Sequence, residues 1–198
     1  LELSRRAGTY VRLVFEWKLS EKTKKANAAL VGWGNTRRII LSDTLLQRFN
    51  EAEVEAVLAH EFGHHVHRHI LRSMVVQAAA TFLGFCLVNA VLLRYSERFG
   101  VVGLSDFANF PLLVLAITGL SLLLLPAVNT YSRAMERQAD AYALAAIEKK
   151  SAFVSSMEKL AELNLAERRP HPWIEFIFHS HPSIEKRIAF AQRFPVRT

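Results

Sequence analysis

The sequence predicts an α+β fold that is mainly helical, with a small sheet of about three strands and two transmembrane helices in mid-chain. Two runs without a charged residue, 74–93 and 110–128, indicate the transmembrane helices. Each run would make a helix of about 30 Å, the thickness of a bilayer's hydrocarbon core. Short alternating segments before residue 43 indicate the sheet, and long stretches with little proline or glycine indicate the other helices.

The predicted sheet lies within the first 42 residues. One face of the segment 10–18 carries the apolar residues Val11, Leu13, Phe15 and Trp17. This alternation predicts a half-buried strand, and a polar loop follows it. Residues 28–33 and 37–42 flank the glycine-centred turn Gly-Asn-Thr, which predicts a hairpin.

The first long helix is predicted to begin near Asn50. Asn50 followed by Glu53 has the spacing of a helix N-cap with a reciprocal capping glutamate, and no proline interrupts the sequence from there to His69. Residues 168–173 break the later helical pattern. Three further helices are predicted after the apolar runs, at 129–150, 151–167 and 182–194.

We expect a single membrane-associated domain over residues 1–198, with a transmembrane hairpin at about 71–94 and 110–129. The alternative is a buried helical hairpin in a soluble protein, although such core helices are usually shorter and carry a polar face.

Neither run is a signal peptide, because both lie in mid-chain. Since the chain begins with leucine, we expect a processed or excised piece with further spans upstream. The single cysteine, Cys86, lies inside the first run, which excludes a disulfide framework.

Charge points to a lipid bilayer as a partner. Lysine and arginine outnumber aspartate and glutamate by 25 to 18, and residues 1–38 hold nine basic and three acidic side chains. We expect no nucleic-acid partner, because the sequence has no recognisable nucleic-acid-binding module.

Basic residues also crowd the outer ends of the two runs: Arg68, Arg72, Arg133, Arg137, Lys149 and Lys150. The connecting loop holds two basic and two acidic residues, so the positive-inside rule places these outer ends in the cytoplasm. The oligomeric state is not determined by the sequence.

The segment 58–70 packs five histidines and one glutamate into thirteen positions. His60 and His64 are four residues apart, so on a helix they can present two imidazole nitrogens to one ion. In the motif HExxH the glutamate between them, here Glu61, projects beside the metal and acts as a general base without being a ligand. The motif also occurs by chance, so a catalytic site requires a third ligand.

Catalytic zinc usually keeps three protein ligands, and Glu136 is the candidate for the third. Asp140 lies one turn later on the same helical face, where it is suited to accept the N–H of a ligand histidine. His64 precedes the first run by ten residues and Glu136 follows the second by eight, so helical rise places them about 15 and 12 Å outside the apolar ends. Two spans return the chain to the side it left. We therefore predict one Zn²⁺ per chain, held by His60, His64 and Glu136.

The remaining histidines of this segment are expected on a hydrated polar face near the membrane. On a continuous helix His65 and His69 point away from the ligand face. His67 is nearer to that face, but it is displaced along the helix axis and does not complete a tetrahedron. Position 70 is isoleucine, so the longer metzincin form of the motif, with a third histidine, is absent.

The chain resembles the membrane zinc metallopeptidases that include bacterial HtpX and the CAAX prenyl endopeptidases. The resemblance covers about residues 10–193 and rests on four ordered blocks: NAALVG followed by RRIILSDTLL, EVEAVLAHEFGHHVHRH, SRAMERQADAYAL, and SHPSIEKR. It implies a zincin-like metallopeptidase domain with the two transmembrane helices inserted between the metal-ligand helices. It also implies a bacterial inner or cell membrane, an active site on the cytoplasmic side, and the same three ligands and base as above.

The resemblance gives roles to three more residues. It implies that Asn27, His181 and Arg187 lie near the substrate or the tetrahedral intermediate. From the residues alone, Asn27 could equally be a turn residue, His181 a cap before Pro182, and Arg187 a surface charge.

The predicted function is zinc-dependent hydrolysis of peptide bonds in membrane-associated proteins, of the quality-control or prenylated-protein-processing type. One alternative is a membrane metal carrier or sensor that uses the histidine-rich helix. Such a protein should have extra ligands within its spans, which offer only Gln77, Cys86 and Asn89. A second alternative, an inactive membrane scaffold, should have lost Glu61 or a ligand, and the sequence retains them.

Overall fold

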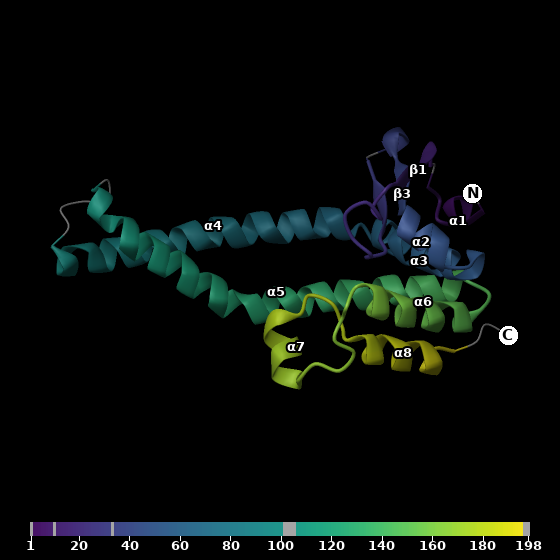
Figure 1. Cartoon of the computed structure of the whole chain (residues 1–198). Helices are drawn as coiled ribbons and strands as arrows, with labels where there is room; N and C mark the ends of the chain where they lie inside the picture. The colour runs from purple at the N-terminus through teal and green to yellow at the C-terminus, as the bar shows by residue number, and fades with distance from the viewer. Residues whose placement is uncertain (1, 10, 33, 101–105, 196–198) are drawn as a thin grey trace.

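Two long helices project together from a globular part that holds the sheet and the other helices (Figure 1). The computed structural model describes residues 2–9, 11–32, 34–100 and 106–195. The α-helices are α1 (Glu2–Arg6), α2 (Asp43–Arg48), α3 (Glu51–Val66), α4 (His69–Tyr95), α5 (Phe110–Ala146), α6 (Lys150–Leu163), α7 (Pro172–Phe178) and α8 (Ile184–Arg193). Short 3-10 turns lie at Gly34–Thr36, Ser96–Phe99 and Phe107–Asn109. The predicted mainly helical α+β fold is confirmed.

The sheet has three strands in the order β1-β3-β2: β1 (Leu13–Trp17), β3 (Arg38–Ser42) and β2 (Ala28–Val31). β2 and β3 pair antiparallel, which confirms the predicted hairpin, while β1 pairs with β3 in parallel. Gly32 in the hairpin has φ +94°, and a Cβ there would lie 2.6 Å from the carbonyl oxygen of Thr36, so the turn requires glycine.

β1 differs from the prediction of a half-buried strand, because all five of its residues are exposed. The buried Val11 precedes the strand, and the helices of the described chain pack against β2 and β3 instead. β2 and β1 are therefore the two edges of the sheet, and β2 is the edge that faces α3.

α3 is the central helix of the globular part. Asn50 and Glu53 form the predicted reciprocal capping box at its start, with hydrogen bonds of 3.0 and 2.8 Å. One side of α3 buries Val57 and Phe62 in a core shared with the sheet. Its other side buries small alanines against α5, α6 and α8, in a core that includes the fully buried Phe153. Small residues let these helices approach closely.

The helix predicted to continue to His69 ends earlier. α3 stops at Val66, and Arg68 adopts a left-handed conformation with φ 55°, after which α4 begins at His69. A left-handed residue cannot continue a right-handed helix, so the chain changes direction at this point. Conversely, the second apolar run and the segment with Glu136 form one continuous helix, α5, which passes through Pro126.

α4 and the first part of α5 are long and apolar enough to cross a membrane. Their most apolar windows are 6% and 0% buried within the described chain. A soluble core hairpin would bury these windows, so that alternative is not supported. Cys86 is a free, exposed cysteine on α4.

Candidate metal centre

His60 and His64 project from adjacent turns of α3, as their spacing predicts. Their Nε2 atoms lie 3.1 Å apart. Glu136 reaches toward the same point from α5, with its carboxylate oxygens 3.4 Å from His60 Nε2 and 3.3 Å from His64 Nε2. The ligand atoms of these three residues all lie within 4.8 Å of one another, and His60 and Glu136 are buried.

The spacing of these atoms fits a tetrahedral ion. Bonds of about 2.0–2.1 Å, the length that zinc makes to nitrogen and oxygen, separate neighbouring tetrahedral ligands by about 3.3–3.4 Å. The two Nε2 atoms lie 3.1 Å apart, and each lies 3.3–3.4 Å from one oxygen of the Glu136 carboxylate, Oε2 beside His60 and Oε1 beside His64. Two histidines and one carboxylate are also a common donor set of catalytic zinc, and they leave one position open.

Gly63 allows the two ligand helices to come this close. A Cβ at this position would lie 2.9 Å from Ala139 Cα and 3.0 Å from the Ala139 carbonyl oxygen. Ala139 is fully buried and follows Glu136 by one turn of α5. The backbones of α3 and α5 are therefore in direct contact beside the ligands.

A second layer of residues orients His60. Its Nδ1 lies 2.8 Å from Asp140 Oδ1, so an Nδ1–H donated to this carboxylate leaves Nε2 free for a metal. Arg187 from α8 grips the same carboxylate, with Nε 2.9 Å from Oδ2 and Nη2 2.5 Å from Oδ1. Burial alone would raise the pKa of Asp140, but the His60 contact and the Arg187 charge outweigh it and lower that pKa.

A similar chain of contacts orients His64, and the sequence did not predict it. His69 is buried, with its Nδ1 3.0 Å from His64 Nδ1 and its Nε2 3.0 Å from Gln138 Oε1. Because the Gln138 oxygen can only accept, His69 carries its proton on Nε2, and its Nδ1 accepts from His64 Nδ1–H. This tautomer leaves His64 Nε2 free for a metal.

The prediction that His69 belongs to a hydrated polar face is therefore wrong. The left-handed residue Arg68 breaks the helix, so His69 does not have the angular position that a continuous helix would give it. His65 and His67 are partly exposed.

Glu61 lines the same pocket as the three clustered residues. Its pKa is raised, chiefly because it is withdrawn from solvent, and the nearby imidazoles of His60 and His64 oppose the effect. Burial would also raise the pKa of Glu136, but hydrogen bonds with the two histidines outweigh it and lower that pKa. The two glutamates thus differ. Glu136 is held ionised between the imidazoles, whereas Glu61 has the raised proton affinity that a general base needs.

The pocket over the cluster has a volume of about 430 Å³ and is bordered by the β2 edge. The three residues singled out by the resemblance all line it. Asn27 is exposed at the start of β2, and His181 is 62% exposed with Nε2 3.4 Å from Glu136 Oε1. Arg187 also borders the pocket, with its guanidinium buried against the carboxylate of Asp140.

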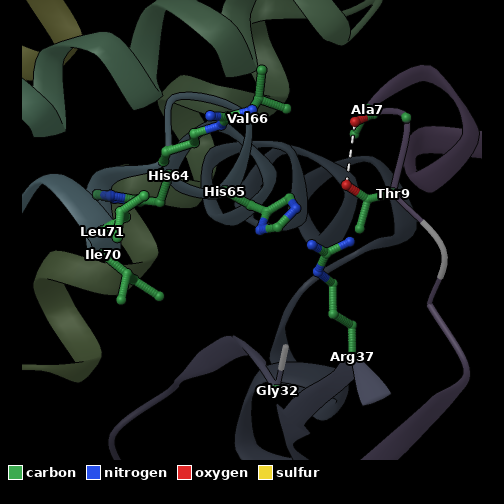
Figure 2. A pocket seen from close by; sticks show the side chains of 11 residues that line it. Ala7, Thr9, Gly32, Arg37, His64, His65, Val66, Ile70 and Leu71 are labelled. Atoms are coloured by element: carbon green, nitrogen blue, oxygen red, sulfur yellow. Dashed lines mark hydrogen bonds between the residues drawn. The ribbon is translucent and has the colours of Figure 1, made fainter. Parts of the chain in front are cut away.

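A neighbouring pocket of about 470 Å³ lies where α3 meets α4. Figure 2 shows Arg37 and His65 directed toward each other across it, with Val66, Ile70 and Leu71 on the same rim as His64. Basic and apolar groups thus extend the cleft from the metal-ligand cluster toward the start of α4.

Three residues of the site were missed in the sequence. Gly63 lies within the motif but its close approach to α5 depends on a distant residue, and the roles of His69 and Gln138 depend on contacts across 69 positions. Only the spacing of Gly63 from His60, one helical turn along the same face, offered a local signal.

An HExxH helix, a carboxylate from a second helix at tetrahedral spacing, and an open pocket beside a free sheet edge are the features of metallopeptidases of the HExxH type. The family model of peptidase family M48 matches residues 1–194. The chain belongs to this family, which confirms the resemblance that its sequence motifs indicated.

Individual relatives agree with the family. The chain is 32% identical over 197 residues to the uncharacterized metalloprotease YhfN of Bacillus subtilis, covering 98% of this chain and 46% of that protein. It is 30% identical over 207 residues to protease HtpX of Cellvibrio japonicus, covering 95% and 67%. It is 34% identical over 180 residues to a CAAX prenyl protease 1 homolog of Arabidopsis thaliana, covering 85% and 40%.

The fold also matches a solved structure. The crystal structure of S. mikatae Ste24p superposes with a TM-score of 0.83 at 27% identity, covering 96% of this chain and 48% of that one. The chain thus spans about half the length of several proteins that it matches.

Proposed function

We propose that this chain carries the active site of a zinc-dependent endopeptidase that cleaves membrane-associated proteins at the cytoplasmic face of the membrane. The observation that carries the proposal is the tetrahedral spacing of His60, His64 and Glu136 with Glu61 in the same pocket. A zinc ion bound there would act as a Lewis acid and lower the pKa of water.

Each residue has a role in the proposed reaction. Glu61 accepts a proton from the attacking water and delivers it to the leaving amine. His181, exposed at the pocket and close to Glu136, donates a hydrogen bond to the oxyanion that forms on the peptide carbonyl. Arg187 is a positioning residue, because it holds Asp140 against His60.

The peptide itself is held by the edge of the sheet. β2 pairs with β3 on one side only, and the pocket borders its other side. An extended substrate can add to such an edge as a further strand, with main-chain hydrogen bonds along β2. Asn27 at the start of β2 then contacts the substrate near the scissile bond.

Names of relatives suggest the substrate class. The matching proteins include HtpX proteases and CAAX prenyl proteases, so the substrates are proposed to be membrane proteins subject to quality control or prenylated proteins. Basic residues at the site-bearing ends of the two apolar helices support a cytoplasmic site. A cysteine introduced at the exposed Asp106, in the loop between the helices, should then be labelled from outside intact cells.

A metal carrier remains the rival function. Within the described residues, one group of potential ligands lies close enough to hold an ion, and that group is the proposed active site. Gln77, a possible ligand within the first apolar helix, instead donates to Thr81 at 3.3 Å. No observation favours transport over hydrolysis.

The substitution Glu61→Gln tests the proposal in the full-length protein. It removes the base but keeps the shape and all three ligands, so the variant should retain about one zinc per chain and lose about 10²- to 10⁴-fold in peptidase rate. Glu55→Gln, the same change on the same helix but away from the pocket, is the matched control and should keep full activity. Wild-type cleavage rates in Glu61→Gln would refute the mechanism.

A further inference from the structure

α7 has its polar and apolar sides reversed relative to a helix in water. Trp173 and Phe178 are 68% and 61% exposed, and Ile174 and Phe176 are nearly half exposed. Its acidic residue, Glu175, is only 3% exposed and accepts hydrogen bonds from Ser183 N and Lys186 Nζ. An amphipathic helix on a soluble protein turns its apolar face inward, so the outer surroundings of α7 should not be water.

The position of α7 places it at the end of the apolar hairpin. Asn129, the first residue after the second apolar run, donates to the Ile177 carbonyl at 2.6 Å. Arg133, one turn further along α5, donates to the carbonyls of Glu175 at 3.0 Å and His179 at 2.6 Å. Because Asn129 and Arg133 are about 6 Å apart along the helix, α7 lies within about one turn of the level where the apolar surface stops.

These same hydrogen bonds fit α7 for an environment with little water. The last carbonyls of a helix have no partner within the helix and are costly to remove from water. In α7 the side chains of Asn129 and Arg133 satisfy the carbonyls of Glu175, Phe176 and Ile177. These three carbonyls near the C-terminal end of the helix therefore do not depend on water for hydrogen bonding.

The direction of α7 matches a helix that lies in the plane of a membrane. Figure 1 shows α7 running across the direction of α5. Arg168 and Arg169 lie four and three residues before the first residue of the helix, and Trp173 is its second residue. Tryptophan and phenylalanine beside basic residues are typical of helices that bind at the boundary of headgroups and acyl chains.

We propose that α7 is an interfacial helix whose side chains Trp173, Ile174, Phe176 and Phe178 insert into the headgroup boundary of the bilayer that the hairpin crosses. The proposal rests on the membrane assignment within the proposed function, but not on peptidase activity. His181 follows α7 by three residues. Insertion would thus fix this side of the pocket close to the membrane surface, where it would receive chains emerging from the bilayer.

Tryptophan fluorescence tests the insertion. A protein with Trp173 as its one tryptophan, made by Trp17→Phe and Trp33→Phe, is reconstituted into phosphatidylcholine vesicles that contain lipids brominated either near the headgroups or near the acyl-chain ends. Two control proteins also carry Trp173→Phe. Phe82→Trp places the reporter on the exposed surface of α4, and Leu46→Trp places it on α2, at the end of α3 remote from the hairpin.

The expected pattern differs among the three proteins. Shallow bromines should quench Trp173 more than deep bromines, deep bromines should quench Phe82→Trp more than shallow ones, and neither should quench Leu46→Trp. Trp173 emission that is as insensitive as Leu46→Trp, in proteins where Phe82→Trp is quenched, overturns the proposal and indicates that water or another protein segment contacts α7. Absence of quenching at both Trp173 and Phe82→Trp overturns the membrane assignment and the proposal with it, whereas failure of the proposed activity alone leaves the expected pattern unchanged.

Discussion

Replacing Gly63 with alanine should separate metal binding from folding stability. The added Cβ would lie 2.9 Å from Ala139 Cα, 3.0 Å from Ala139 O and 3.2 Å from Tyr142 Cβ. Ordinary carbon contacts are about 3.5–4.0 Å, so α3 and α5 must move apart by about 0.5–1 Å. Metal–ligand distances tolerate deviations of only about 0.2 Å. Since His60 and His64 lie on one helix and Glu136 on the other, the movement disrupts the ligand triangle.

The effect on stability should be smaller. Alanine is favoured over glycine inside a helix by about 1 kcal/mol, while overpacking typically costs about 1–3 kcal/mol. The metal-free Gly63→Ala protein should therefore lose only about 0–2 kcal/mol in its free energy of unfolding. Its zinc affinity should fall about 10- to 100-fold or more, as for other changes that disturb the geometry of metal ligands.

The assay is zinc titration of the metal-free protein in detergent, together with thermal unfolding and peptidase rate. Gly119→Ala is the matched control, because a Cβ at Gly119 on α5 meets nothing within 4 Å. The control should bind zinc like the wild type. If Gly63→Ala also binds zinc with wild-type affinity, the close contact of the two helices does not maintain the ligand geometry, and the reasoning is wrong.

The other predictions concern the second layer, an anchoring ion pair and the metal. His69→Ala should lower zinc affinity about 10- to 100-fold, because the contact that holds the proton of His64 on Nδ1 is lost, whereas His67→Ala should have little effect. Equal effects of the two substitutions in a zinc titration would contradict the assigned contacts. Burial would raise the pKa of Glu53, but hydrogen bonds, chiefly from Lys159, outweigh it and hold that pKa below its ordinary 4.5. Ionised Glu53 therefore stabilises the fold above pH 4.5. This stabilisation is lost as the pH falls through the lowered pKa. At pH 7 the free energy of unfolding of Glu53→Gln should therefore be lower than that of the wild type by about 1–3 kcal/mol, and this difference should vanish in acid. A difference that persists in acid would exclude the ion pair as its source. A chelator should abolish cleavage and lower the unfolding midpoint, with both restored by added zinc; a midpoint that does not change would argue against a bound metal.

Local patterns in the sequence predicted a large part of the structure. The capping box at Asn50, the hairpin after residue 28, the two apolar helices and the mainly helical fold are confirmed. Each of these depends on residues that are close in sequence, where helical or strand periodicity and chain length decide the outcome. The matched family confirms the resemblance carried by the ordered motifs.

Two local predictions were wrong for reasons that lie outside the local pattern. β1 has the alternation of a half-buried strand, but all five of its residues are exposed, and α2 and α3 pack chiefly against β3 and β2. His69 continues a helical pattern on paper, but the left-handed Arg68 redirects the chain. α7 was not predicted at all, because its apolar residues follow a proline-rich break and face outward.

The sequence by itself determined which side chains were available for the chemistry: two histidines one helical turn apart with a glutamate beside the first, and a candidate third ligand on a second helix. Only the tertiary structure decided how they meet. The approach of α3 to α5 at Gly63, the grip of Arg187 on Asp140, and the link from Gln138 through His69 to His64 join residues separated by 47 to 76 positions. Such contacts leave no periodic signal, because they depend on how whole helices pack and not on the conformation of any one segment.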